Sequence, residues 1–232
     1  MTHKVIVFDL DDTLYAKSDP FLETVKQYTE KSYDAYQLYT DFLKYSEHYF
    51  NEYTSNVITL EQSYIKRMQK TLQTIDIHLS DSEALIFNTK YQLAQKAIGL
   101  KESFKDLLEF YSQQGIELAI LTNGPTHTQI KKCECLKLEQ FIPRKNWFVS
   151  DQIGYKKPDP RVFEYVCQQM NTQPNQMIMI GDTIQSDVAG AMLSGWHYIW
   201  TRPHSLKHNT SNPHVVYSIS TLKNRLDDFI NS

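Results

Sequence analysis

The chain has 232 residues, of which 41% are hydrophobic and 22% are charged, and its formal net charge is −3. This length can bury one large core or two modest ones, and the near balance of charge gives no electrostatic reason to expect nucleic acid or an anionic membrane as a partner. No stretch approaches the roughly 20 apolar residues of a spanning helix, and acids stand where the apolar region of a signal peptide would run, so we expect a cytoplasmic protein.

The first predicted element is a buried strand over Val5–Phe8, and three aspartates follow it within four positions. Asp9, Asp11 and Asp12 repel one another, and removing carboxylates from water costs free energy unless a cation compensates for it. A solvated turn is the alternative interpretation. We favour a cation site, because complementary groups follow other predicted strands.

Residues 21–98 contain neither glycine nor proline, and many of their tyrosines recur at helical spacing. This pattern predicts roughly four helices with short polar links. We expect an all-α domain over residues 16–97, inserted after the first strand. Its aromatic side chains could stack on a nucleobase, but a place in the core between helices is favoured for any one tyrosine.

In the remainder of the chain, short apolar runs alternate with amphipathic stretches. Runs that are apolar at every position are typical of strands buried on both faces, and helices between them indicate parallel crossovers. We therefore predict an α/β fold, a doubly wound, Rossmann-like parallel sheet built from residues 1–15 and 98–232. The polar stretch Arg202–Pro213 is predicted to be a surface loop. The further strands are expected at Ile116–Leu121, Trp147–Val149, Met177–Ile180 and Tyr198–Trp200, and helices at 101–114, 126–136, 160–170, 185–194 and 220–230.

Polar groups follow four of the predicted strands at the point where each strand ends. In an open parallel sheet these ends meet at one edge, and ligands bind there. After Asp9 and Asp11, the groups are Thr122 and Asn123, then Lys156 and Lys157, and finally Asp182 and Asp187.

These groups suit a divalent cation and a phosphate. Carboxylate oxygens of Asp9, Asp11 and Asp182 are ligands that Mg²⁺ prefers, and the ion leaves positions for phosphate oxygens. A carboxylate beside Mg²⁺ can attack phosphorus, giving an aspartyl-phosphate that water hydrolyses, with a second carboxyl as proton shuttle. The glycine patterns of nucleotide-dependent kinases and of dinucleotide-binding proteins are missing.

Four segments resemble, in order and spacing, the four motifs of the haloacid dehalogenase superfamily. The resemblance covers residues 1–14 and 100–200, and the helical insert resembles the C1-type cap of bacterial 5′-nucleotidases and phosphoglycolate-type phosphatases. The segments are FDLDDTL, LTNG, KKPDPRVF and GDTIQSD.

This resemblance implies a role for each matching residue. Asp12 stands where the family varies and receives no catalytic role. Tyr15, which begins the connection into the insert, is a candidate to face the substrate. The implied roles are Asp9 as nucleophile and metal ligand, Asp11 as general acid and base that binds Mg²⁺ through its backbone carbonyl, Thr122 and Asn123 as phosphate ligands, Lys157 as the cation that steadies nucleophile and phosphoryl charge, Asp182 as a Mg²⁺ ligand, and Asp187 as an acid that orients the metal water or the lysine.

We therefore expect a Mg²⁺-dependent phosphatase that acts on a small soluble phosphate monoester, either a nucleoside 5′-monophosphate or a sugar or short-acid phosphate. The aromatic insert slightly favours the nucleotide. A phosphomutase, a haloacid dehalogenase and a non-catalytic regulatory protein on the same fold are the alternatives. The intact Asp11 argues against dehalogenation, which needs no acid for its leaving group. Oligomeric state is not indicated.

Overall fold

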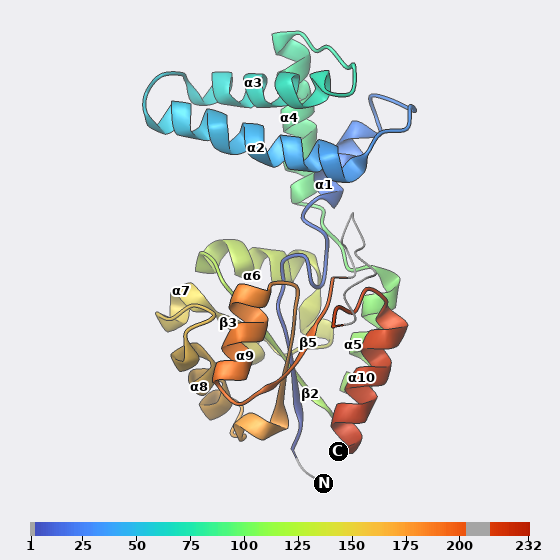
Figure 1. Ribbon diagram of the computed structural model, residues 1–232, viewed down its shortest axis with the longest axis vertical. Coiled ribbons are helices and arrows are strands. Elements are labelled where there is room, and N and C mark those ends of the chain that lie inside the picture. Colours follow the sequence, from blue (N-terminus) through green and yellow to red (C-terminus); the bar gives the residue numbers. More distant parts are fainter. Residues whose placement is uncertain (1–2, 203–213) are drawn as a thin grey trace. The chain divides into compact units, whose positions relative to one another are not determined.

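The computed structural model describes residues 3–202 and 214–232, which belong to two compact units (Figure 1). The first unit comprises Met1–Ala16 and Gly99–Ser232, and the second comprises Lys17–Ile98. Beyond Arg202, the stretch predicted as a surface loop lies outside the described residues. Within the described ranges, no helix combines the length and the apolar character that crossing a membrane would require.

The first unit is built on a parallel sheet whose strand order is β3-β2-β1-β4-β5. This confirms the predicted doubly wound sheet, and the first and third strands have the predicted bounds. β1 is fully buried, as expected for a central strand covered on both faces. The strands are β1 (Val5–Phe8), β2 (Glu117–Thr122), β3 (Trp147–Val149), β4 (Met177–Gly181) and β5 (His197–Trp200).

Helices cover both faces of this sheet. α8 and α9 lie on one side and α5 and α10 on the other (Figure 1). On the first side, Val5 and Val7 of β1 share a core cluster with Phe163 and Trp196, whose rings meet edge to face at 5.0 Å. The helices are α5 (Glu102–Gln113), α6 (Thr126–Cys135), α7 (Ser150–Ile153), α8 (Pro160–Gln169), α9 (Ala189–Leu193) and α10 (Ile219–Asn231), and single 3₁₀ turns lie at Leu138–Gln140, Arg144–Asn146 and Pro174–Gln176.

One predicted helix of this unit is wrong in its first half. A helix was expected over 185–194, but a π-helical turn, η4 (Ile184–Val188), precedes the short α9. The wider turn arises because the Val188 amide reaches back to the Thr183 carbonyl at 3.4 Å. It brings Asp187 into the interior, where its side chain is almost completely buried. The sequence pattern also missed the four-residue helix α7.

The second unit consists of four helices, as predicted. Capping boxes at Thr59 and Ser80 begin the third and fourth helices by satisfying backbone amides that have no partner within the helix. Phe21 stacks on Phe42 with ring centroids 4.2 Å apart, inside a core that also buries Tyr91. The helices are α1 (Asp19–Val25), α2 (Ala35–Thr54), α3 (Leu60–Gln73) and α4 (Asp81–Gln95).

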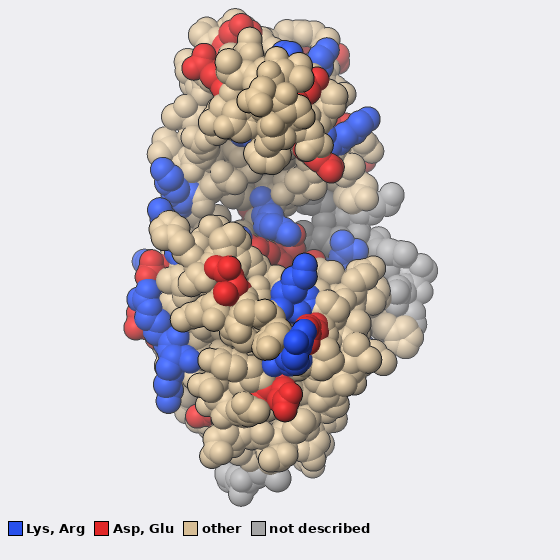
Figure 2. Space-filling model, turned by 90° about the vertical axis from the view of Figure 1, so that its left-hand side faces the viewer, with Lys and Arg blue, Asp and Glu red and all other residues tan. Residues whose placement is uncertain are grey.

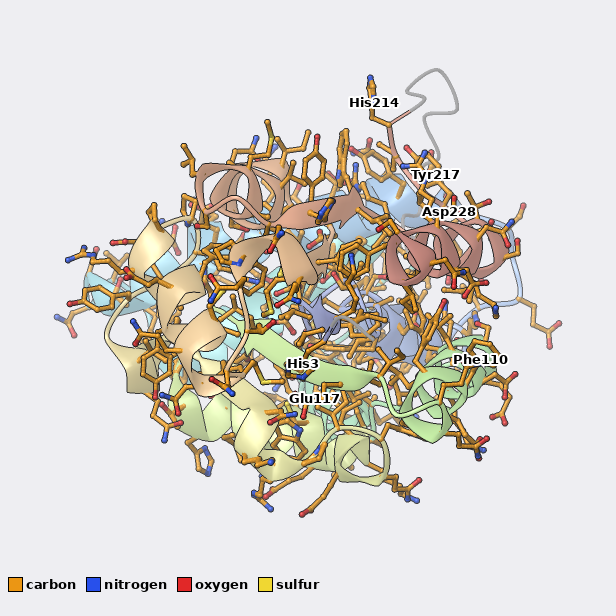
Figure 3. All side chains as sticks on the ribbon, turned by 90° about the horizontal axis from the view of Figure 1, so that it is seen from below. His3, Phe110, Glu117, His214, Tyr217 and Asp228 are labelled. Carbon is orange, nitrogen blue, oxygen red and sulfur yellow. The ribbon has the colours of Figure 1, made fainter. Side chains whose placement is uncertain are left out.

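Charged side chains of both signs are interspersed with uncharged surface on the face shown in Figure 2. At the amino ends of the strands, seen from below in Figure 3, His3 Nε2 lies 3.1 Å from Glu117 Oε2, and both side chains are nearly half exposed. Such an exposed pair contributes little to stability. The chemically unusual groups gather instead at the carboxyl ends of the strands.

Candidate active site

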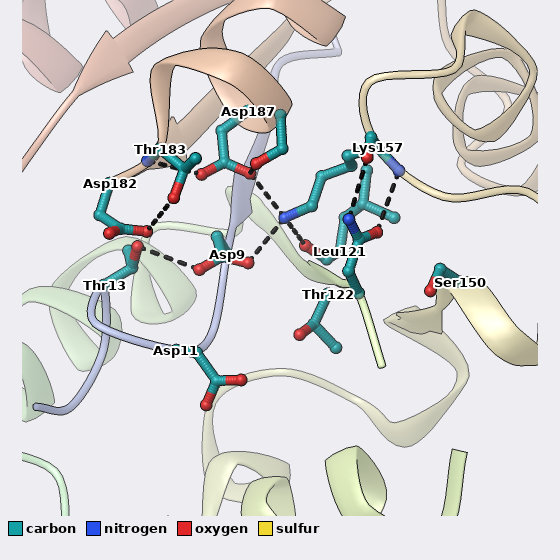
Figure 4. Close-up of polar contacts among 12 residues, drawn as sticks. Asp9, Asp11, Thr13, Leu121, Thr122, Ser150, Lys157, Asp182, Thr183 and Asp187 are labelled. Carbon is teal, nitrogen blue, oxygen red and sulfur yellow. Dashed lines mark hydrogen bonds and ion pairs between the residues drawn. The ribbon is translucent and has the colours of Figure 1, made fainter. Parts of the chain in front are cut away.

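The carboxyl ends of β1, β2 and β4 and the loop after α7 bring the predicted site residues to one edge of the sheet (Figure 4). Parallel pairing sets this arrangement, because Phe8 is in register with Ile120 on one side and Ile180 on the other. The Asp9 amide continues the register by donating to the Ile180 carbonyl at 2.8 Å. The residues that follow β1, β2 and β4 therefore start at the same height along the strand direction, at the carboxyl edge of the sheet.

Lys157 lies at the centre of the site, and its side chain is almost completely buried. Its Nζ atom donates to Asp9 Oδ1 at 2.6 Å, to Asp187 Oδ1 at 2.7 Å and to the Leu121 carbonyl at 2.7 Å. An ammonium group has three donors, so all of them are used. The neighbouring Lys156 is exposed. The structure thus places Lys157, and not Lys156, against the aspartates.

The carboxyl group of Asp9 is held from both sides. Oδ1 accepts from Lys157, and Oδ2 accepts from the Thr13 hydroxyl at 3.2 Å. Burial raises the pKa of Asp9 to about 7; the Lys157 ammonium acts in the opposite direction, and the charges of Asp187 and Asp182 raise it further. A single lysine therefore does not compensate for the negative charge gathered around Asp9.

Asp9, Asp182 and Asp187 form an acidic group in which one carboxylate oxygen from each lies within 4.8 Å of the others. Three carboxylates facing one ammonium leave an excess of negative charge in a buried place, and oxygen donors at this spacing suit a hard divalent cation. The residues present therefore fit Mg²⁺. The Asp11 carboxyl is not a member of this group. The expected contribution of Asp11 to Mg²⁺ through its backbone carbonyl stays a prediction.

Both carboxylate oxygens of Asp187 accept hydrogen bonds. Oδ1 accepts from Lys157, and Oδ2 accepts from the Thr183 amide at 3.0 Å. Its carboxyl group packs directly on Gly181, where a Cβ atom would overlap the side chain of Asp187. The π-helical turn and this glycine together allow Asp187 to reach the lysine. Asp182, which is half-buried, accepts from the Thr183 hydroxyl at 3.0 Å.

Replacing Gly181 with Ala is expected to destabilise the protein by about 1–3 kcal/mol, because the added methyl group displaces Asp187 from Lys157 and from the Thr183 amide. Urea unfolding monitored by circular dichroism measures the effect. Gly99→Ala is the matched control, since a Cβ at Gly99 meets nothing within 4 Å, and it should stay within about 0.5 kcal/mol of the parent. Equal stability of the two variants would contradict the overlap.

Thr122 is the last residue of β2, one position beyond the predicted end of the strand, and Asn123 follows it. The side chains of these two residues differ in what they contact. The Asn123 amide donates to the Lys157 carbonyl and accepts from the Lys157 amide, both at 3.0 Å. Its side chain thus holds the lysine loop in place. The buried Thr122 hydroxyl accepts from Gln129 Nε2 at 2.6 Å. Gly124, with a φ of 140°, leaves room for the Gln129 side chain to cross to Thr122.

The Asp11 carboxyl turns away from Asp9 in Figure 4 and meets three donors. Lys132 Nζ lies 2.7 Å from Oδ1 and 2.9 Å from Oδ2, Gln129 Nε2 lies 3.2 Å from Oδ2, and the buried Tyr15 hydroxyl donates to Oδ1. Burial opposes ionisation of Asp11, but these hydrogen bonds and the Lys132 charge lower its pKa. Tyr15, a candidate to face the substrate, is engaged with Asp11.

Lys132, Gln129 and Thr13 were not predicted as site residues. A signal existed for the first two, because they are three positions apart on the helix expected over 126–136 and so share one face. Asp12, which was given no role, has a φ of 61° in the turn after Asp11. This left-handed conformation is one that Asp and Asn adopt more readily than most residues.

Comparisons with known proteins identify one protein family. A family model described as haloacid dehalogenase-like hydrolase matches residues 3–195. The glyceraldehyde 3-phosphate phosphatase of Pyrococcus furiosus is 28% identical over 202 residues, covering 85% of this chain and 80% of the relative. The pyrimidine 5′-nucleotidase PynA of Streptococcus pneumoniae is 26% identical over 235 residues, covering 98% and 96%. The structure of the HAD-hydrolase YfnB from Bacillus subtilis bound to magnesium matches with a TM-score of 0.62 at 21% identity, covering 98% of this chain and 100% of that chain.

Proposed function

Because this chain belongs to the haloacid dehalogenase-like hydrolases, we propose that it is a Mg²⁺-dependent phosphatase that hydrolyses small soluble phosphate monoesters through an aspartyl-phosphate on Asp9. The observation that carries the proposal is the buried Lys157, which holds Asp9 Oδ1 at 2.6 Å beside two further carboxylates. The arrangement orients a carboxylate as nucleophile and leaves a negative charge excess that a divalent cation would balance.

In the first step, an ionised oxygen of Asp9 attacks phosphorus, and the bond between phosphorus and the leaving oxygen breaks as the Asp11 carboxyl, in its protonated form, gives its proton to that oxygen. In the second step, Asp11 takes a proton from water, the water oxygen attacks the same phosphorus, and the Asp9 carboxylate is released with inorganic phosphate. The Lys157 ammonium and the Thr122 hydroxyl stabilise the phosphoryl oxygens.

Asp9, Asp182 and the backbone carbonyl of Asp11 would hold the cation, with Asp187 orienting Lys157. When bound, Mg²⁺ supplies positive charge that neutralises the phosphoryl oxygens and keeps Asp9 ionised. The helical unit Lys17–Ile98 is the cap-type insert in this proposal. It follows the first motif along the chain.

The substrate class follows from chemistry and from the relatives. By their names, one relative acts on glyceraldehyde 3-phosphate and another on pyrimidine 5′-nucleotides. A sugar or short-acid phosphate and a nucleoside 5′-monophosphate are therefore both proposed as candidates. Dehalogenation is disfavoured, because displacement of halide needs no proton donor and three side chains hold Asp11 in place.

The test is an assay of the purified protein on p-nitrophenyl phosphate, pyrimidine and purine nucleoside monophosphates, glyceraldehyde 3-phosphate and phosphoglycolate. We expect turnover with Mg²⁺, loss of turnover after dialysis against EDTA, and recovery when Mg²⁺ is returned. Mg²⁺ at about 100 times its Kd should also stabilise the fold by about 2.7 kcal/mol.

Asp182→Asn provides the control for the metal. It removes one carboxylate of the acidic group, so it should raise the Mg²⁺ concentration needed for half-maximal activity and weaken Mg²⁺ binding by calorimetry. Full activity in EDTA, or no hydrolysis of any member of the panel, would contradict the proposed function. A product in which the phosphoryl group has moved within the substrate would identify a mutase instead.

A further inference from the structure

Arg67, on α3 of the helical unit, is a half-buried cation that no carboxylate of the described residues balances. Its Nη2 atom donates to Asn88 Oδ1 at 2.5 Å. Its guanidinium carbon lies 4.8 Å from the ring centre of Tyr64 and 5.9 Å from that of Phe42. Charges withdrawn from water are normally paired, because losing their hydration costs free energy. Arg67 has a neutral amide and aromatic rings around it instead.

Arg161 shows the usual arrangement in this chain. Its side chain is 61% exposed, and its Nη2 atom lies 2.5 Å from Asp159 Oδ2. Arg67 is the reverse case, with less water around it and no carboxylate. Burial lowers the pKa of the Arg67 guanidinium, and only the phenol groups of Tyr91 and Tyr64 act against this. The positive charge of Arg67 is therefore not compensated within the helical unit.

Most N–H donors of the Arg67 guanidinium have no acceptor in residues 3–202 and 214–232. The group carries five N–H bonds, of which one reaches Asn88. The Nε atom is shut off from solvent and donates to none of the described groups. Nη1 is not shut off in this way, so a ligand from solution can reach it. The guanidinium therefore has donors left for a ligand.

Helix α4 adds two more donors beside this group. The Asn88 side chain is 3% exposed, and its amide nitrogen donates to no residue in the described part of the chain. Tyr91 Oη accepts from Gln95 Nε2 at 2.8 Å, and no described residue accepts the phenol's own hydrogen. Burial raises the pKa of Tyr91, although the nearby Arg67 charge lowers it, so the phenol keeps its hydrogen at neutral pH.

We propose that Arg67 is the centre of an oxyanion-binding site in the helical unit, which takes the oxygens of a small carboxylate or phosphate group on its terminal nitrogens while Asn88 holds the guanidinium in place. The planar guanidinium fork matches the spacing of carboxylate and phosphate oxygens, and such charge-assisted hydrogen bonds are stronger than neutral ones. This site lies outside the proposed active site and does not depend on the proposed function.

The test measures binding of sulfate, phosphate and acetate to the whole protein in EDTA, without turnover. Urea unfolding in each anion is compared with unfolding in sodium chloride of equal ionic strength, for the parent, Arg67→Gln and Lys70→Gln. Lys70 is the matched control, because it is an exposed cation on the same helix. Any binding at the active site is common to all three proteins and cancels in the comparison.

An oxyanion that binds the folded protein raises the urea midpoint. The parent and Lys70→Gln should gain equally from at least one of the three anions. Arg67→Gln should gain less, with binding of that anion weakened about tenfold or more, because a charge-assisted contact is lost. Arg67→Lys keeps the charge without the planar fork, so it should bind less tightly than the parent but more tightly than Arg67→Gln. It is the second variant if Arg67→Gln does not fold.

Nuclear magnetic resonance of the arginine Nε–H groups locates the binding. The signal of Arg67 is identified by its loss in Arg67→Gln, and it should be visible because Nε is shielded from water. Titration of the parent with the same anion should shift this signal more than those of the other arginines.

Two substrates distinguish an anion carried by the substrate from a separate ion. Phosphoglycolate carries a carboxylate beside its phosphate, and p-nitrophenyl phosphate does not. A KM that rises in Arg67→Gln for phosphoglycolate alone would support a site for the substrate's carboxylate. A KM unchanged for both, together with lost anion binding, would support a site for a separate anion.

Two results would overturn the inference. One is an equal gain in urea midpoint for the parent and Arg67→Gln with every anion, which would place any binding elsewhere. The other is an Arg67 Nε signal that stays in place while the anion stabilises the parent. A protein that hydrolyses no phosphate would contradict the proposed function and leave these binding measurements unaffected, so the two failures are distinguishable.

Discussion

Asp9→Asn is expected to reduce turnover by a factor of about 10³ or more and, at pH 8, to make the metal-free protein more stable than the parent. The loss of turnover follows because the amide is a poor nucleophile for phosphorus. The gain in stability follows from electrostatics, since burial together with Asp187 and Asp182 raises the pKa of Asp9 from 3.8 to about 7, although Lys157 opposes them.

The direction with pH follows from proton binding. A carboxyl whose pKa is raised on folding binds its proton more tightly in the folded protein than in the unfolded chain. The contribution of Asp9 to stability is therefore most favourable below about pH 4 and is lost as the pH rises toward about 7, by an amount on the order of a few kcal/mol. Asn has no such dependence, and Lys157 keeps Asp187 and the Leu121 carbonyl as partners.

Urea unfolding at pH 5 and pH 8 in EDTA measures this difference, and the same titrations with Mg²⁺ should remove the disadvantage of the parent. Asp12→Asn is the matched control. It makes the same chemical change at a left-handed position that Asn tolerates, so it should change neither turnover nor pH dependence. A metal-free Asp9→Asn protein that is less stable than the parent at pH 8 would show that the Lys157 contact dominates.

Lys157→Met should be the most damaging single change in the site, because it removes the only ammonium that contacts Asp9 and Asp187 among the described residues. Removing one partner of a buried ion pair costs about 3–5 kcal/mol, since it leaves unbalanced charge in the interior. Turnover should fall about 10²-fold or more, because the charge that stabilises the phosphoryl oxygens is lost.

The destabilisation of Lys157→Met should depend on pH. Without the ammonium, which opposes the rise in the pKa of Asp9, the Asp9 carboxyl binds its proton more tightly still in the folded protein, so the variant should recover part of its stability as the pH falls from 8 to 5. Lys156→Met is the control, because Lys156 carries the same charge next in sequence but is exposed. If both lysine variants unfolded at the same urea concentration, the buried ion pairs would have no energetic role.

Local patterns predicted most of the elements well. The predicted bounds of β1 and β3 match the observed ones. In a strand that is buried on both faces every residue is apolar, so the first and last residues of the strand can be recognised in the sequence. The prediction of a regular helix over 185–194 was wrong in its first half, and the reason is tertiary. In the π-helical turn, Asp187 packs on Gly181 and pairs with Lys157. No short-range pattern encodes that contact.

The sequence allowed the location of the site at one edge of the sheet to be predicted, but not most of the contacts between its side chains. Strand ends of a parallel sheet meet at one edge whatever the details, so Asp9, Thr122 and Asp182 could be brought together from the chain order alone. The hydrogen bond from the Asn123 side chain to the Lys157 backbone could not be predicted in this way, because it joins atoms of residues 34 positions apart.

The amino-acid sequence by itself determined the two-part architecture, the parallel sheet and the edge at which the polar groups collect, because hydrophobic periodicity and residue order act locally and topology follows from them. Only the tertiary structure decided the full set of partners of each carboxylate: it pairs Asp11 with Lys132, 121 positions along the chain, and it adds Asp187 to the expected contact of Asp9 with Lys157. Those pairings depend on α6 side chains that reach Asp11 beyond the end of β1 and on the room left at Gly124 and Gly181, which are properties of packed elements and of no single segment.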